Sequence, residues 1–267
     1  LPTHGARRVN AFLKFSNRPR AFGGPFLALL VLVVSLQSFS RRQFGESFSR
    51  LPGDLGDMRL VLCILEHGHQ YLTGQQADYW DARFFYPHPN TMALSETQLG
   101  SLPFYTAVRL TGADRETSFQ YWILIGYGLN YAAAAFALRR LGIGWLGTTF
   151  GAYIFAFDLV QTIHLGHPQI VYRFPAPVAF AFFIEFLRTL RWFPLAIALF
   201  AFAFQCYISL YPGYFLALLL VSYAAAEVIL GKAILRKYLS LPGKVWAAHG
   251  AVALAALLSL TALLIHY

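Results

Sequence analysis

Seven apolar runs recur along the chain, and each is close to the length that a helix needs to cross a membrane. They cover residues 21–39, 119–138, 143–160, 174–187, 193–208, 212–230 and 245–265. About 20 mostly apolar residues span the roughly 30 Å of hydrocarbon in a bilayer. Hydrophobic residues make up 57% of the sequence and charged residues only 12%, which is too few charges for an ordinary soluble surface. We therefore expect an all-α integral membrane protein with about seven transmembrane helices.

Basic residues are concentrated in alternate connections between these runs. They are Arg139, Arg140, Arg188, Arg191, Lys232, Arg236, Lys237 and Lys244, and a further basic segment precedes the first run. Connections rich in Lys and Arg stay on the cytoplasmic side of a membrane. The pattern predicts a multi-pass protein of the bacterial inner membrane with a cytoplasmic N-terminus. The net charge of +9 then reflects topology, so we expect membrane lipid and not nucleic acid as a partner.

The first apolar run divides the chain into parts. We expect a cytoplasmic segment at 1–20, the first transmembrane helix at 21–39, an extracytoplasmic loop at 40–118 and helices two to seven at 119–267. A cleaved signal peptide is the rival interpretation of 21–39, but the residues after it make a poor cleavage site. Pro212 and Gly213 predict a tight turn between two helices. Because the chain ends inside an apolar run, we also expect it to be part of a longer protein.

The large extracytoplasmic loop is too long for a simple connection, so it should fold on the membrane surface. Four of its apolar residues recur at helical spacing, namely Met58, Val61, Leu62 and Leu65. This spacing predicts an amphipathic helix over residues 54–67. Nine of the twelve acidic residues of the chain also lie in the loop. Solubility alone can account for most of them, because an exposed loop needs charge.

Asp54 and Asp57 stand at a Gly/Pro-bent entry to the predicted helix. One interpretation is structural: Asp54 at the N-cap and Asp57 at the third helical position would accept hydrogen bonds from free N–H groups and complement the helix dipole. The other interpretation is functional, because two carboxylates near the membrane surface can bind a divalent cation or hold a general base. The sequence leaves both interpretations open.

A first transmembrane helix followed at once by a large outward loop with an acidic motif resembles the GT-C superfamily of polyprenyl-phosphate-sugar-dependent glycosyltransferases. The segments that carry the resemblance are 53–57 (Gly-Asp-Leu-Gly-Asp), 85–90 (Phe-Tyr-Pro-His-Pro-Asn), Ser95 with Glu96, and 164–169 (His-Leu-Gly-His-Pro-Gln). They are similar to segments of bacterial membrane proteins of the GT-C type, and the resemblance covers most of the chain.

The resemblance implies a transfer in which a loop carboxylate takes a proton from an acceptor hydroxyl while that oxygen attacks a lipid-linked sugar. By that implication Asp54 or Asp57 is the catalytic base, and the other carboxylate binds metal or orients the acceptor. The implied substrate-binding residues are Arg59, Glu66, His88, Glu96, His164, His167, Gln169 and Arg173. Among them we expect His164, His167 and Arg173 to bind the phosphate of the donor. The Asp-x-x-Asp spacing differs from the tighter acidic pairs of some members, which leaves a divalent metal cofactor open.

Two other classes of function also remain open. A polytopic transporter or lipid flippase needs polar groups within several spans, whereas Asn130 and Gln205 are the main polar residues inside these runs. A non-enzymatic scaffold is the second alternative. Separately, the polar residues of the connection 164–173 can be interfacial residues that simply lie at helix ends. The concentration of ionisable residues in the outward loop favours chemistry at the membrane surface.

Overall fold

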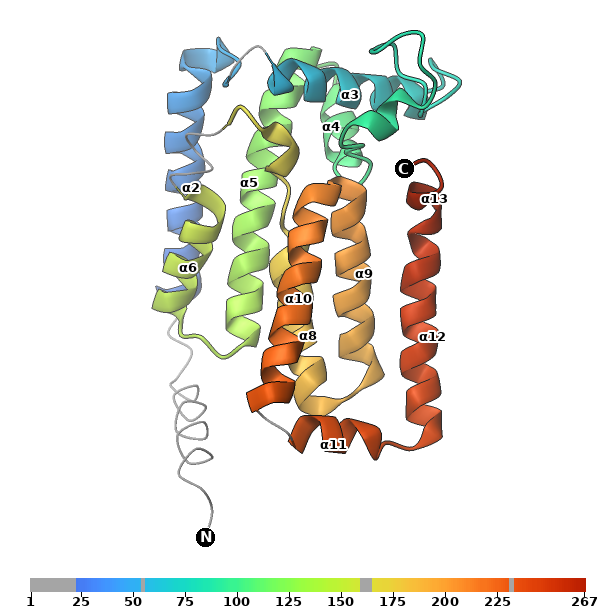
Figure 1. The fold of residues 1–267 in the computed structure, drawn as a ribbon. Coiled ribbons are helices and arrows are strands. Elements are labelled where there is room, and N and C mark those ends of the chain that lie inside the picture. The colour runs from blue at the N-terminus through green and yellow to red at the C-terminus, as the bar shows by residue number, and fades with distance from the viewer. Residues whose placement is uncertain (1–22, 54–55, 159–164, 231–232) are drawn as a thin grey trace.

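The computed structural model describes residues 23–53, 56–158, 165–230 and 233–267, and these form helices with no strand among them (Figure 1). The bundle consists of α2 (Gly23–Phe44), α5 (Arg115–Arg140), α6 (Trp145–Phe157), α8 (Pro175–Thr189), α9 (Trp192–Ile208), α10 (Leu210–Leu230), α12 (Gly243–Ser259) and α13 (Thr261–Leu264). At one end lie α3 (Asp57–Leu72) and α4 (Leu102–Arg109), and at the other lies α11 (Ala233–Leu239). Short 3-10 turns are η2 (Glu46–Phe48), η3 (Thr91–Leu94) and η4 (Pro168–Ile170).

Five stretches of the described chain are long and apolar enough to cross a membrane. They are Gly23–Phe44, Arg115–Arg140, Pro168–Thr189, Leu210–Leu230 and Gly243–Leu264. The apolar helices α6 and α9 are shorter, although each coincides with one of the seven predicted runs. The predicted all-helical fold is therefore confirmed for the described residues, and its long apolar helices are compatible with a membrane protein.

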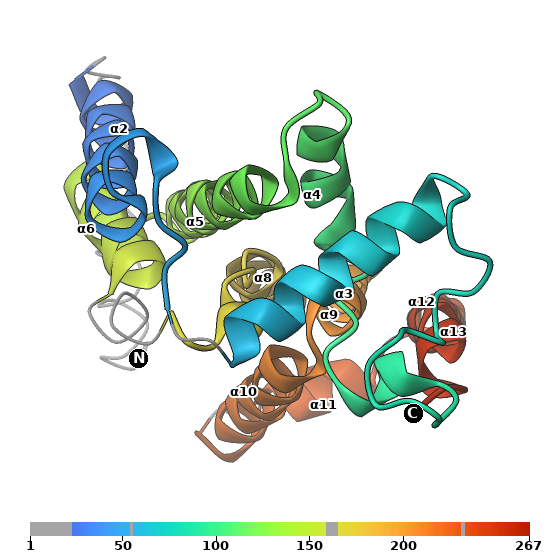
Figure 2. The same cartoon turned by 90° about the horizontal axis from the view of Figure 1, so that it is seen from above.

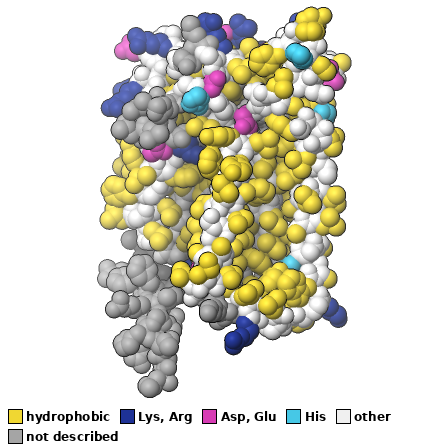
Figure 3. Space-filling model, in the orientation of Figure 1, with side chains coloured by type: hydrophobic (Ala, Val, Ile, Leu, Met, Phe, Trp, Pro, Cys, Tyr) yellow, Lys and Arg dark blue, Asp and Glu magenta, His cyan; other side chains and the backbone are white. Residues whose placement is uncertain are grey.

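The surface of the bundle is apolar along the middle of its helices. Figure 3 shows hydrophobic side chains over most of one face, with most Lys and Arg toward the two ends. Large exposed side chains include Leu29 and Val34 on α2, Ile154 on α6 and Val221 on α10. In water such a surface promotes association, whereas in a bilayer it meets hydrocarbon.

The core of the bundle is centred on α5. Its Trp122 is fully buried and packs against the ring of Tyr172, which comes from the connection before α8 (ring centroids 4.7 Å apart). Gly126 permits this approach, because a Cβ atom there would lie 2.7 Å from the Tyr172 ring. The buried cluster thus extends from α2, α5 and α6 to the non-helical connection that precedes α8.

Helix α3 lies across the end of the bundle (Figure 2). The predicted amphipathic helix exists, but it begins at Asp57 and continues to Leu72, beyond the expected end, because Gly68 packs against Leu102 of α4. Gly56 occupies the N-cap position without a side-chain hydrogen bond, so Asp57 is the first helical residue and not the third. The structural interpretation of Asp57 as a capping residue at the third position is therefore wrong.

Helices α9 and α10 are joined by a single non-helical residue, Ser209. The predicted turn at Pro212 and Gly213 is wrong, because both residues belong to the first turn of α10. Proline is tolerated there, since the first N–H groups of a helix have no acceptor within the helix. The first two N–H groups of α10 donate instead to the carboxylate of Glu96, at 2.5 and 3.0 Å.

The two ends of the bundle carry different polar groups. Arg140 at the end of α5 forms an ion pair with Glu185 of α8, with 2.6 Å between Nη2 and Oε2. The N-terminal end of α5 lies at the opposite end, beside α4 and beside α3, whose first residue is Asp57 (Figure 1). The residues predicted to lie on opposite sides of the membrane therefore do lie at opposite ends of the bundle.

Candidate functional site

Asp57 and His167 bring together two segments that are 110 residues apart in the chain. Oδ2 of Asp57, at the start of α3, lies 2.8 Å from Nδ1 of His167, which directly precedes η4. The same oxygen accepts a hydrogen bond of 3.0 Å from Nε2 of Gln169. Three residues singled out from the sequence thus meet, and we call Asp57, His167 and Gln169 the Asp57 cluster.

The Asp57 cluster is open to the surface, with the side chains of Asp57 and His167 exposed by 40% and 61%. Hydrogen bonds from Gln169 and His167 outweigh the partial burial of the carboxylate and hold the pKa of Asp57 below its ordinary value. An ionised carboxylate only accepts hydrogen bonds, so Nδ1 of His167 is the donor, and in the neutral form of the imidazole Nε2 carries the lone pair. Nε2 can therefore take a proton from a bound molecule.

The connection between α6 and α8 is held by buried side chains from other helices. Nδ2 of Asn130 on α5 donates to the carbonyl oxygen of Val171 (2.7 Å), and its Oδ1 accepts from the N–H of Arg173 (3.0 Å). Gln205 on α9 donates to the carbonyl oxygen of Tyr172 (3.1 Å). Irregular backbone at membrane depth needs protein partners of this kind. The two polar residues inside the predicted runs therefore fix the segment that carries His167.

Arg173 contacts the end of α6 and the residue that follows it. Its Nη2 donates to the carbonyl oxygen of Phe155 (2.7 Å) and lies 3.6 Å from Oδ2 of Asp158. Only 13% of the Arg173 side chain is exposed. These contacts tie the connection to the end of α6, and the contact of Arg173 with a donor phosphate stays a prediction.

Two of the predicted substrate-binding carboxylates have protein partners outside the Asp57 cluster. Glu66 on α3 forms a two-pronged ion pair with Arg109 of α4 (2.9 and 3.0 Å) and accepts a hydrogen bond of 2.6 Å from Tyr105. Glu96 accepts from the start of α10. Both carboxylates stabilise the fold. The sequence does not predict that Arg109 and Tyr105 contact Glu66, because 43 and 39 residues separate them from it and no local spacing rule links them.

The remaining predicted residues lie apart from the Asp57 cluster or outside the described chain. Arg59 is exposed on α3 and lines a cavity of about 790 Å³. His88 is exposed in the loop that follows the cis Tyr86–Pro87 bond. Asp54 and His164 lie outside the described residues, so their roles as base and phosphate ligand stay predictions.

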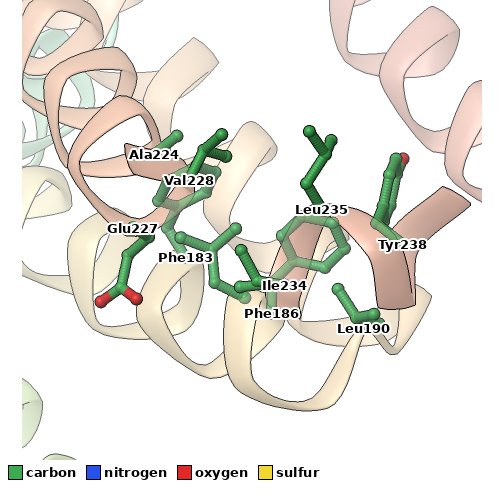
Figure 4. A pocket seen from close by; sticks show the side chains of 10 residues that line it. Phe183, Phe186, Leu190, Ala224, Glu227, Val228, Ile234, Leu235 and Tyr238 are labelled. Carbon is green, nitrogen blue, oxygen red and sulfur yellow. The ribbon is translucent and has the colours of Figure 1, made fainter. Parts of the chain in front are cut away.

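A second pocket lies at the opposite end of the bundle, between α8, α10 and α11 (Figure 4). Its volume is about 200 Å³, and eight of its ten lining residues are hydrocarbon side chains such as Phe183, Phe186 and Leu235. Glu227 supplies a carboxylate, which accepts a hydrogen bond of 2.8 Å from Tyr223. A pocket of this composition suits hydrocarbon better than a reacting polar group.

The Asp57 cluster by itself does not form a metal site. Among the described residues, no three His, Cys, Asp or Glu side chains converge as ligands of one ion. Divalent cations such as Mg²⁺ and Ca²⁺ need several oxygen ligands, of which Asp57 supplies a single carboxylate. The described residues therefore give no ligand set for the divalent cation that the sequence left open.

The chemistry that this cluster can perform follows from one oriented imidazole at one end of the bundle. Its outer nitrogen can meet a hydroxyl proton or an anionic group. Such chemistry serves group transfer as well as binding, and a helical fold alone does not distinguish them. No family model matches the chain, and no curated protein or solved structure matches it at a significant level.

Proposed function

We propose that the chain is a membrane-embedded glycosyltransferase of the GT-C kind, which moves a sugar from a polyprenyl-phosphate donor to an acceptor. The observation that carries this proposal is the 2.8 Å contact between Asp57 and His167. It joins the loop after the first transmembrane helix to the connection before α8. Both segments carry motifs of the GT-C resemblance, which implies that residues of the reaction lie in them.

In this proposal His167 is the general base and Asp57 positions it. Nε2 of His167 takes the proton of the acceptor hydroxyl while the acceptor oxygen forms a bond to the anomeric carbon. The bond between that carbon and the lipid phosphate breaks, and the phosphate leaves with the bonding electrons. The carboxylate of Asp57 fixes the tautomer of His167 and stabilises the imidazolium that forms. Asp54 is the alternative base that the sequence predicts.

The proposal includes a topology in which all seven apolar helices cross the bacterial inner membrane. The N-terminus and the Arg140 end of the bundle face the cytoplasm, as the distribution of Lys and Arg predicts. The Asp57 cluster then faces outward. The separation of Asp57 and Arg140 to opposite ends of the bundle supports this arrangement.

A transporter is less well supported by the buried polar groups. Transport needs polar side chains along a path through the bundle. Asn130 and Gln205 lie inside the bundle, but both hold the backbone of the connection before α8. Their hydrogen bonds support a structural role and not a path for a substrate.

The proposed function is tested with purified protein in lipid vesicles that contain a labelled polyprenyl-phosphate sugar. With a hydroxyl-bearing acceptor present, we expect release of polyprenyl phosphate and movement of the label to the acceptor. The His167→Gln variant keeps a polar side chain but cannot serve as a base, so it provides the background rate. Release no faster than this background, across a panel of donors and acceptors, would contradict the proposal.

A further inference from the structure

The cavity of about 790 Å³ lies between α3, the loop that precedes η3, and the start of α5. Its lining residues from α3 recur at helical spacing, namely Arg59, Leu62, Cys63, Glu66, His67 and Gln70. They lie about half a turn around the helix axis from Asp57, which is not a lining residue. The cavity is therefore separate from the Asp57 cluster. We propose that it binds the phosphate group of a membrane lipid.

The two carboxylates in the cavity wall are both neutralised by protein partners. Glu66 is held by Arg109, whose side chain lies outside the lining, at 2.9 Å between Nε and Oε2. Glu116 pairs with the lining residue Arg115 at 2.7 Å. Neither carboxylate is therefore available to balance the other positive charges of the cavity.

Arg59 and Arg83 supply those remaining charges. Both side chains are exposed and line the cavity, and within the described part of the chain neither guanidinium has a hydrogen-bond or ion-pair partner. Guanidinium groups present several N–H donors in a planar fork that fits the oxygens of a phosphate. Two unpaired guanidinium groups also match the charge of a phosphate monoester, which is about −1.5 to −2 at neutral pH.

The rest of the cavity favours a phosphate that is carried by a lipid. Leu51, Leu62 and Phe84 add apolar walls beside the arginines. Helix α3 lies across the end of the bundle (Figure 2), which is the depth of lipid headgroups when the long helices cross a bilayer. A lipid buries apolar surface against these walls, whereas inorganic phosphate gains nothing from them.

A native cysteine reports whether the cavity is occupied. Cys63 lines the cavity and is exposed, whereas Cys206 is buried. In detergent, phosphatidic acid should slow the reaction of Cys63 with a water-soluble maleimide at least about tenfold. Diacylglycerol, which lacks the phosphate, should leave the rate within about twofold, and so should inorganic phosphate at the same concentration. Equal protection by diacylglycerol or by inorganic phosphate would overturn the assignment to a lipid phosphate.

Charge variants test whether the arginines hold the phosphate. The double variant Arg59→Gln with Arg83→Gln should lose the protection of Cys63 by phosphatidic acid. Arg42→Gln is the matched control, because Arg42 is an exposed arginine near the end of α2 and lies outside the cavity. Because neither cavity arginine has a described partner, both variants should keep the elution profile of the folded protein. Full protection in the double variant would overturn the proposal.

This inference stands apart from sugar transfer. Protection of Cys63 is measured without any donor sugar. The lipid can therefore protect Cys63 in a protein that transfers no sugar, and a protein that transfers sugar can lack this protection. A protein that binds phosphatidic acid through Arg59 and Arg83 but transfers no sugar would keep this inference and lose the proposed function.

Discussion

Nδ1 of His167 lies 2.8 Å from Oδ2 of Asp57, so the start of α3 is fastened to the connection before α8. Gln169 donates to the same carboxylate oxygen at 3.0 Å. Because these hydrogen bonds lower the pKa of Asp57, the carboxylate is ionised throughout the neutral range. The contact therefore links the start of α3 to the connection before α8 and leaves Nε2 as the nitrogen of His167 that is free of Asp57.

The first prediction concerns the pH dependence of stability. A carboxylate whose pKa is lower in the folded protein contributes stability above its ordinary pKa, and this contribution is lost as the pH falls through the lowered value. Wild type should therefore exceed Asp57→Asn in Tm at neutral pH, and the difference should shrink in the acid range below the ordinary pKa of Asp. Thermal unfolding in detergent at a series of pH values measures this. A difference in Tm that does not shrink as the pH falls below the ordinary pKa of Asp would refute the contact.

The second prediction concerns the buried amides that hold the connection. Asn130→Leu leaves the buried carbonyl of Val171 and the partly buried N–H of Arg173 without their side-chain partner, and an unpaired buried group costs about 1–3 kcal/mol. Gln205→Leu leaves one such group, the carbonyl of Tyr172, without its side-chain partner. We expect both variants to unfold at lower temperature, with the larger decrease for Asn130→Leu. Equal Tm values for wild type, Asn130→Leu and Gln205→Leu would show that these hydrogen bonds do not hold the connection.

The third prediction compares two ion pairs at the end of the bundle that carries α3 and α4. Glu66 and Arg109 are mostly covered, with 17% and 22% of their side chains exposed, and Tyr105 adds a third hydrogen bond. Glu66→Gln should lower the free energy of unfolding by about 1–3 kcal/mol. Glu116→Gln breaks the exposed pair with Arg115, which contributes at most about 1 kcal/mol. Denaturant titration should show the larger loss in free energy of unfolding for Glu66→Gln. A larger loss for Glu116→Gln would contradict this prediction.

The fourth prediction concerns topology. Single cysteines at Asp57, His88 and His167 should react with an impermeant maleimide from one side of the membrane, and a cysteine at Arg140 from the other. The background protein needs Cys63→Ser, because the native thiol of Cys63 is exposed. Labelling of Arg140→Cys from the same side as Asp57→Cys would rule out the proposed arrangement.

Hydrophobic periodicity predicted the helices well because it is a local property of the chain. Within the described residues each apolar run overlaps a helix, and the last run overlaps both α12 and α13. The stripe of Met58, Val61 and Leu65 faces the core of the protein. The boundaries depend on tertiary contacts and were less predictable. The packing of Gly68 against Leu102 extends α3, and Pro212 sits inside α10 where a turn was expected.

The candidate site was only partly predictable for the same reason. Residue type and side of the membrane singled out Asp57, His167 and Gln169, but their meeting depends on a connection held by Asn130 and Gln205. Nothing in the local sequence shows that Glu66 and Glu96 are instead occupied by Arg109 and by the start of α10.

The most direct test measures sugar transfer in vesicles by Asp57→Asn, His167→Gln and the double variant, with Asp78→Asn as a control. Asp78 is an exposed carboxylate of the same loop, and its backbone contact with Trp80 survives in Asn. Loss of a positioned base costs about 10²–10⁴-fold in rate, and residues that act as a unit are not additive. We expect a loss of that size in His167→Gln, a substantial loss in Asp57→Asn, and no further loss in the double variant. Transfer at the wild-type rate by both single variants, with folded protein present in equal amounts, would contradict the account.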